Sequence, residues 1–200
     1  MAEFTIKTYD SKLHNIYMKG DVDEEMWNSL VDKINEIKAA DKEIDETNIG
    51  TLSLFGIEAQ AIHPSINIYL CTYGGYIHDM FAIYDEIKNL TKEYIVNIYC
   101  VGKIMSAGTV IMLAVPLENR FSYANTTFMY HTLSGCTYGK MKEMEENVEE
   151  SKRLHKLMWN IIKENTKIPE EKLEEIYKCK KDWYINAEQA KKYKVINKIL

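Results

Sequence analysis

INIYLC (residues 66–71) and IVNIYCV (95–101) are runs of isoleucine, valine and tyrosine with the length of buried β-strands. The glycine pair at 74–75 marks a turn after the first run. Residues 78–90 then carry apolar side chains at helical spacing: Met80, Ile83, Tyr84, Ile87 and Leu90. Strand, helix and strand with short joins make a βαβ unit. We therefore expect two parallel strands in one sheet with a right-handed crossover.

Similar patterns extend to both sides of this unit and predict one α/β domain over residues 1–200. On the N-terminal side we expect a strand at 15–18, a helix at 26–37 and an irregular, elaborated connection at 40–65. On the C-terminal side we expect a buried helix at 105–114, a strand at 127–131, a long amphipathic helix at 141–165, a short helix after Pro169, a strand at 183–185, a helix at 186–193 and a closing strand at 195–200.

Composition excludes several classes of function. The 200 residues are 46% hydrophobic, which suffices for one core, and the net charge is −5 with lysine and glutamate intermixed. Nothing resembles a basic patch for nucleic acid or anionic lipid, so we expect neither partner. No apolar run approaches the roughly 20 residues of a membrane span, and MAEFTIKTYD lacks the order of a signal peptide. We expect a cytoplasmic protein.

The four cysteines, Cys71, Cys100, Cys136 and Cys179, are widely spaced and form no C-x-x-C pair. Neither a zinc site nor a disulfide framework is indicated, so we expect reduced thiols, no metal and no cofactor. Cys71 and Cys100 end β-rich runs, where cysteine is commonly a small buried apolar residue.

Four positions could together carry acyl transfer, which needs a hydroxyl, a base, a group that orients the base and N–H donors for the oxyanion. Ser106 begins a predicted helix, Gly75 lies in a turn after a strand, His131 ends a strand, and Asp182 follows lysines. Each also has an ordinary structural explanation: a helix cap, a tight turn, a core histidine and a partner for the lysines.

These segments, in this order, resemble the ClpP family (peptidase family S14), the proteolytic subunits of the ATP-dependent Clp protease, over roughly residues 13–200. The family's strand and Ser-Pro-Gly-Gly is similar to LCTYGG (70–75), and its Ala-Ile-Tyr-Asp occurs unchanged at 82–85. Its Gly-x-Ala-Ala-Ser-Met/Ala-Gly resembles GKIMSAG (102–108). Its Met-Ile-His-Gln-Pro resembles MYHTL (129–133), and its Arg-Asp-x-Phe segment resembles KDWYINAEQA (181–190).

The resemblance implies a role for each candidate. Ser106 would be the nucleophile, His131 the general base and Asp182 the carboxylate that orients it, while the N–H groups of Gly75 and Ala107 would form the oxyanion hole. It also implies a ClpP/crotonase-like fold of repeated β-β-α-type units with a projecting handle at about 132–165. The expected protein is a serine endopeptidase for polypeptides, in heptameric rings stacked as a 14-mer and fed by an AAA+ ATPase.

The chain departs from the family pattern at several points. The proline before Gly-Gly and the Gln-Pro after the histidine are absent, and Lys181 replaces an arginine that helps join the family's rings. The 40–65 connection is longer than the family's. Three alternatives stay open: a ClpP-like protease of capsid maturation, a crotonase-like acyl-CoA enzyme, and a ring subunit without catalysis.

Overall fold

A twisted, mostly parallel sheet forms the centre of the computed structural model, which describes residues 6–57 and 61–200. Its main path runs in the order β1-β2-β3-β4-β7, all parallel, and β5 continues beyond β4 along the same edge of β3. β6 pairs antiparallel with β5. The strands are β1 Asn15–Val22, β2 Ile66–Gly75, β3 Val96–Met105, β4 Arg120–Ser122, β5 Thr127–Tyr130, β6 Trp183–Asn186 and β7 Lys198–Ile199.

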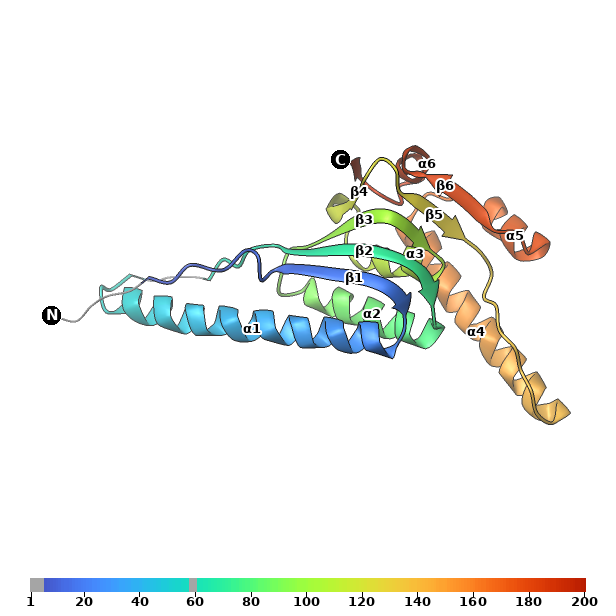
Figure 1. Cartoon of the computed structure of the whole chain (residues 1–200), viewed down its shortest axis with the longest axis horizontal. Coiled ribbons are helices and arrows are strands. Elements are labelled where there is room, and N and C mark those ends of the chain that lie inside the picture. The colour runs from blue at the N-terminus through green and yellow to red at the C-terminus, as the bar shows by residue number, and fades with distance from the viewer. Residues whose placement is uncertain (1–5, 58–60) are drawn as a thin grey trace.

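The helices α1 and α2 lie side by side beneath one face of this sheet (Figure 1). In the described residues the α-helices are α1 Glu24–Ser53, α2 Ile77–Leu90, α3 Ala107–Ile111, α4 Met141–Asn165, α5 Glu170–Cys179 and α6 Ala187–Lys192, and two 3₁₀ turns cover Met112–Ala114 and Leu117–Asn119. The predicted βαβ unit is confirmed as β2-α2-β3 with its two strands parallel.

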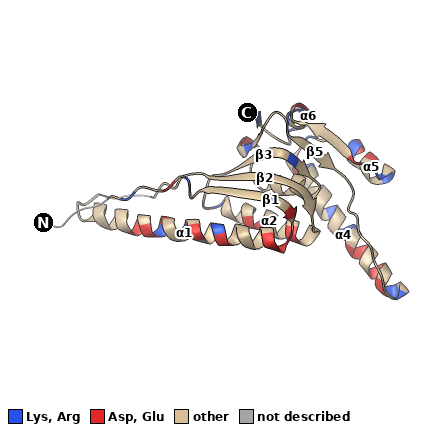
Figure 2. Ribbon diagram, viewed as in Figure 1, with Lys and Arg blue, Asp and Glu red and all other residues tan. Residues whose placement is uncertain are grey.

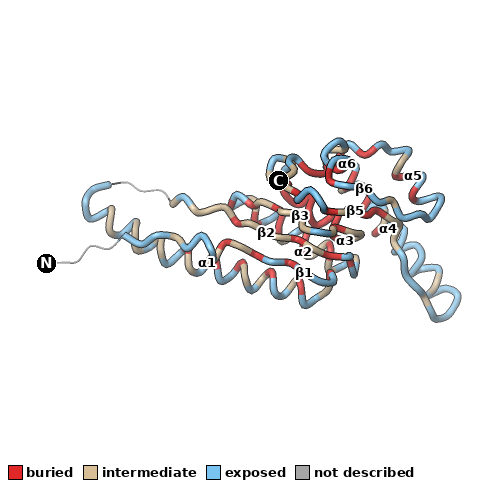
Figure 3. Tube along the Cα trace, turned by 45° about the horizontal axis from the view of Figure 1, so that its top comes forward, coloured by how far each residue is buried: buried red, intermediate tan, exposed pale blue. Residues whose placement is uncertain are grey.

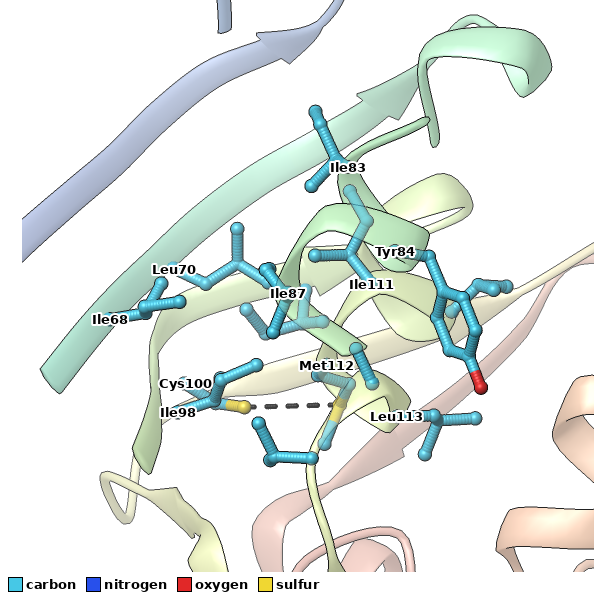
Figure 4. Packing of buried hydrophobic residues seen from close by; sticks show 14 of the residues in the cluster. Ile68, Leu70, Ile83, Tyr84, Ile87, Ile98, Cys100, Ile111, Met112 and Leu113 are labelled. Carbon is cyan, nitrogen blue, oxygen red and sulfur yellow. Dashed lines mark hydrogen bonds between the residues drawn. The ribbon is translucent and has the colours of Figure 1, made fainter. Parts of the chain in front are cut away.

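The core lies between the sheet and the helices, because alternate strand residues face α2 and α3. Ile68, Leu70, Ile98 and Cys100 are fully buried, and Figure 4 shows them packing against Ile83 and its neighbours on α2. Burying these aliphatic side chains contributes roughly 1.5–3 kcal/mol each. Cys100 donates a weak hydrogen bond to the sulfur of Met112 (3.9 Å), and burial raises the pKa of its thiol.

On the opposite face, in-register residues of neighbouring strands form an aromatic ladder. Tyr17, Tyr69, Tyr99 and Phe121 stack in sequence, with ring centroids 4.9–5.1 Å apart. The asparagines two residues earlier are joined side chain to side chain, Asn97 to Asn67 and Asn67 to Asn15.

The expected irregular connection at 40–65 is wrong for its first part, because α1 continues to Ser53. The segment before β1 packs along this extra length and satisfies its polar side chains. Asn48 exchanges two 2.9 Å hydrogen bonds with the backbone of Lys7, and Tyr9 donates to Asp45. Residues 58–60 of the predicted connection lie outside the described residues. Residues 7–13 and the C-terminal half of α1 form an arm, much of which is exposed (Figure 3). Acidic and basic residues are intermixed along α1 (Figure 2).

A buried polar cluster joins the arm to the sheet. The ring of His14 lies 3.0 Å from the carbonyl oxygen of Asp10 through Nδ1 and 3.0 Å from Asp41 Oδ2 through Nε2. Tyr94 donates to the same carboxylate oxygen at 3.0 Å. His14 and Asp41 are 0% and 2% exposed, so neither can exchange its partner for water.

The handle expected at about 132–165 is an irregular segment followed by α4, which projects from the body (Figure 1). Its base is held by Arg120, which is 2% exposed and donates to the carbonyl oxygens of Val115 (2.8 Å), Asn165 (2.9 Å) and Leu113 (3.4 Å). Burial lowers the pKa of this guanidinium to about 10, which leaves it charged at neutral pH. A buried cation thus ties the C-terminal end of α4 to the core.

The cysteines and the apolarity of the helices bear on two expectations from the sequence, buried thiols and the absence of a membrane span. Cys71 is half-buried rather than buried, because it lies on the open face of the sheet, and all four cysteines are unpaired in the structure. Within residues 6–57 and 61–200, none of the helices combines the length and apolarity needed to cross a bilayer.

Candidate active site

Ser106 occupies the junction between β3 and α3. A helix was predicted from residue 105, but β3 extends to Met105, so Ser106 lies between strand and helix. Its backbone angles are φ 50° and ψ −121°, a region that a residue with a Cβ adopts at a cost of about 1–3 kcal/mol. Its N–H donates to the carbonyl of Met129 (2.9 Å), and its carbonyl accepts from the N–H and hydroxyl of Thr109 (2.9 and 2.6 Å).

The hydroxyl of Ser106 makes no capping bond to α3 and instead faces His131. His131 Nε2 lies 2.7 Å from Ser106 Oγ. The sheet explains this contact, because β5 runs parallel beside β3 with Met105 opposite Met129, and His131 follows directly after β5. The arrangement of hydroxyl and imidazole supports proton transfer and argues against a purely structural cap.

Asp182 lies on the other side of the imidazole. Its Oδ1 is 3.9 Å from His131 Nδ1, an ion-pair distance that is longer than a hydrogen bond, and its side chain is 49% exposed. It comes directly before β6, where Trp183 pairs with Tyr130. Antiparallel pairing of β5 with β6 therefore brings the histidine and the carboxylate together.

The glycine turn packs directly against Ser106. A Cβ on Gly74, where φ is 111°, would lie 2.6 Å from the Cβ of Ser106, and a Cβ on Gly75 would lie 2.1 Å from the carbonyl oxygen of Val22. Only glycine permits these approaches. Gly75 and Ala107 both line the pocket that contains Ser106 and His131, so the structure brings together all five residues selected from sequence.

Apolar side chains complete the pocket, and sequence reasoning missed their role. Its volume is about 50 Å³. The apolar lining consists of Ile77, Met80, Tyr130, Leu133, Met158, Trp159 and Ile162. The α4 residues among them share the helical spacing of ordinary core residues, and only the fold places α4 beside the serine. In the described parts of the chain, no cluster of histidine, cysteine and carboxylate side chains has the arrangement of a metal site.

Known proteins are similar in sequence to the region that surrounds this site. The profile of the family described as Clp protease matches residues 34–200. The chain belongs to the Clp protease family. It is 29% identical to the ATP-dependent Clp protease proteolytic subunit of Dehalococcoides mccartyi over 76% of this chain and 74% of the relative. It is 27% identical to proteolytic subunit 2 of Pseudomonas aeruginosa over 96% of this chain and 83% of that protein.

The fold agrees with this assignment. The structure of a ClpP1 N165D mutant from Listeria monocytogenes superposes with a TM-score of 0.72 at 24% identity, covering 95% of this chain and 92% of the other. The predicted mixed α/β, ClpP-like fold is therefore confirmed, and membership of the Clp protease family makes the chain a serine-type peptidase. Of the alternatives left open by sequence, the family match favours peptide hydrolysis over acyl-CoA chemistry.

Proposed function

We propose that Ser106, His131 and Asp182 are the catalytic triad of this Clp-type serine endopeptidase. The 2.7 Å contact between Ser106 Oγ and His131 Nε2 is the observation that carries the proposal. The serine also sits in a sharp, strained turn that exposes its hydroxyl to the pocket, a placement that suits a nucleophile.

The proposed reaction begins when Ser106 Oγ attacks the carbonyl carbon of a peptide bond while its proton passes to His131 Nε2. The resulting imidazolium faces the carboxylate of Asp182, and the N–H groups of Gly75 and Ala107 stabilise the oxyanion. His131 then gives the proton to the leaving amine as the C–N bond breaks. This leaves the acyl part of the substrate as an ester on Ser106 Oγ. Water, deprotonated by the same histidine, hydrolyses this ester and restores the serine. The groups of this mechanism come from the chain itself, so we propose that it needs no metal or cofactor.

The 3.9 Å gap at Asp182 bears on when this triad is complete. A hydrogen bond to Nδ1 requires the carboxylate to approach by about 1 Å. Asp182 follows Lys180, which has φ 51°, and Lys181, in an exposed turn after α5. A change of about 1 Å in this turn would close the gap without altering the sheet.

We propose that the chain works as a homo-oligomer in the cytoplasm, in rings of seven stacked as a 14-mer, with polypeptides delivered by an AAA+ ATPase. The printed names of the relatives, which are subunits of ATP-dependent proteases, support the ATPase partner. The projecting α4 supports contact between rings. Light scattering at working concentration tests the assembly, and a stable monomer would contradict it.

Labelling with a serine-reactive phosphonate tests the nucleophile. The wild-type chain should take one label at Ser106, and Ser106→Ala should take none. Ser134→Ala is the matched control, because Ser134 lines the same pocket and should leave the labelling unchanged. Equal labelling of the wild type and Ser106→Ala would exclude the assignment.

A further inference from the structure

Trp159, which comes from α4, is one of the apolar residues that line the pocket beside Ser106. We propose that Trp159 restricts the substrate residue on the acyl side of the cleaved bond to small aliphatic side chains such as alanine and valine. This inference rests on the proposed role of Ser106, because that role places the acyl side of the substrate at this pocket.

The size of the pocket supports the restriction. Its volume of about 50 Å³ is roughly a third of the 150 Å³ of an engineered cavity that admits benzene. A phenyl ring therefore does not fit unless the walls move. A methyl or isopropyl group fits and meets apolar atoms of Met80 and Ile77.

The position of Trp159 is fixed by the rings behind it. The side chain is 8% exposed, and the ring of His155, one turn earlier on α4, meets the indole edge-on at a centroid distance of 5.0 Å. The ring of Tyr177 from α5 lies 4.8 Å beyond His155. Rotating the indole out of the pocket would break this series of contacts, so the wall is rigid.

Trp159 is also the bulkiest side chain in the pocket wall and, at 8% exposed, is less deeply buried than several of its neighbours. Met80, Tyr130 and Ile162 are each 1% exposed and pack within the central core. Met158 is unbranched and adapts its shape to a ligand. The indole is larger than a phenyl ring and rigid, so its removal adds the space that an aromatic substrate side chain needs.

The expected selectivity follows from the cost of misfit. One methylene more or less in an apolar specificity pocket changes kcat/KM by about 10–200-fold. For the wild type we therefore expect kcat/KM to fall at least about tenfold from an alanine to a leucine substrate, and further for phenylalanine. For Trp159→Ala the order should reverse, with at least a tenfold gain for phenylalanine relative to alanine.

The experiment uses the full-length chain and a series of fluorogenic peptides that differ only in the residue before the cleaved bond: alanine, valine, leucine or phenylalanine. Phosphonates carrying the same four side chains give a second readout, the rate of labelling at Ser106. Leu157→Ala is the matched control, because Leu157 lies on the same helix, is 41% exposed and does not line the pocket. Trp159→Leu provides a milder enlargement if the alanine variant does not fold.

The outcomes separate this inference from the proposed function. The inference is supported if the wild type and Leu157→Ala prefer small side chains while the Trp159 variants gain activity on leucine and phenylalanine relative to alanine. A wild type that accepts phenylalanine as readily as alanine would overturn the restriction and leave Ser106 as the nucleophile. An unchanged preference in both Trp159 variants would overturn the role of the indole. Absence of labelling by all four phosphonates would contradict the proposed function, and this inference with it.

Discussion

Replacing Ser106 by glycine should give a more stable protein than replacing it by alanine, although glycine usually destabilises. Both variants remove the hydroxyl and its 2.7 Å contact with His131, so they differ only in the Cβ. Alanine retains the strain of φ 50°, about 1–3 kcal/mol, and glycine relieves it. Glycine costs about 0.5–1 kcal/mol in backbone entropy relative to alanine. The difference is a net advantage of about 1 kcal/mol for Ser106→Gly.

Urea unfolding at fixed protein concentration measures this difference, which corresponds to a melting-temperature shift of about 2–4 °C for a chain of this size. Gly50 in α1 is the control of opposite sign. No atom lies within 4 Å of the Cβ it would gain, so Gly50→Ala should stabilise by about 0.5–1 kcal/mol. If Ser106→Ala proves as stable as Ser106→Gly or more so, the turn stores no strain and the reasoning fails.

Three further predictions concern stability. Arg120→Met should lower the free energy of unfolding by about 3 kcal/mol, since carbonyls at the base of α4 lose a charged donor, and urea denaturation would show it. Asp41→Asn should cost about 1–3 kcal/mol, because the buried His14 ring and the Tyr94 hydroxyl lose the carboxylate they share; no measurable loss in the same assay would argue against a stabilising role for these contacts. Desolvation lowers the pKa of His155 from 6.5, so the fold favours its neutral form, and stability should fall as the pH drops below about 6.5. His155→Gln should flatten that dependence in urea titrations between pH 5.5 and 7.5.

The parallel pair of strands at the centre of the fold could be predicted from sequence because the patterns that indicate it are local. Alternation in β2 and β3 and the apolar stripe of α2 each occupy a few consecutive residues, and short joins leave one topology. The length of α1 was not accessible. Beyond Ile37 the helix is held by the polar side chains of Asp41, Asp45 and Asn48. Their hydrogen-bond partners come from residues 7–14, 63 and 94. The spacing of apolar residues cannot predict a helical segment that is stabilised by polar contacts with residues distant in sequence.

The candidate site likewise has features that the sequence predicts and features that it does not. The order of the glycine turn, Ser106, His131 and Asp182 along the chain matched a family pattern, and the strand pairings bring these residues together. The positive φ of Ser106 and the 3.9 Å separation at Asp182 are properties of packing that no local pattern encodes. The same holds for Trp159, whose spacing on α4 is that of any core residue.

The aromatic ladder on the open face has a consequence for how the strands find their alignment. A slip of one residue between parallel strands is already penalised, because it would turn Ile68 outward and Tyr69 toward the helices. A slip of two residues keeps every side chain on its proper face, so alternation alone does not prevent it. It would, however, place asparagine opposite tyrosine and break both the ring stacking and the amide chain across β1, β2 and β3. The tyrosine and asparagine rows on the open face thus favour the observed register over a two-residue slip, which the inward–outward alternation of side chains does not exclude.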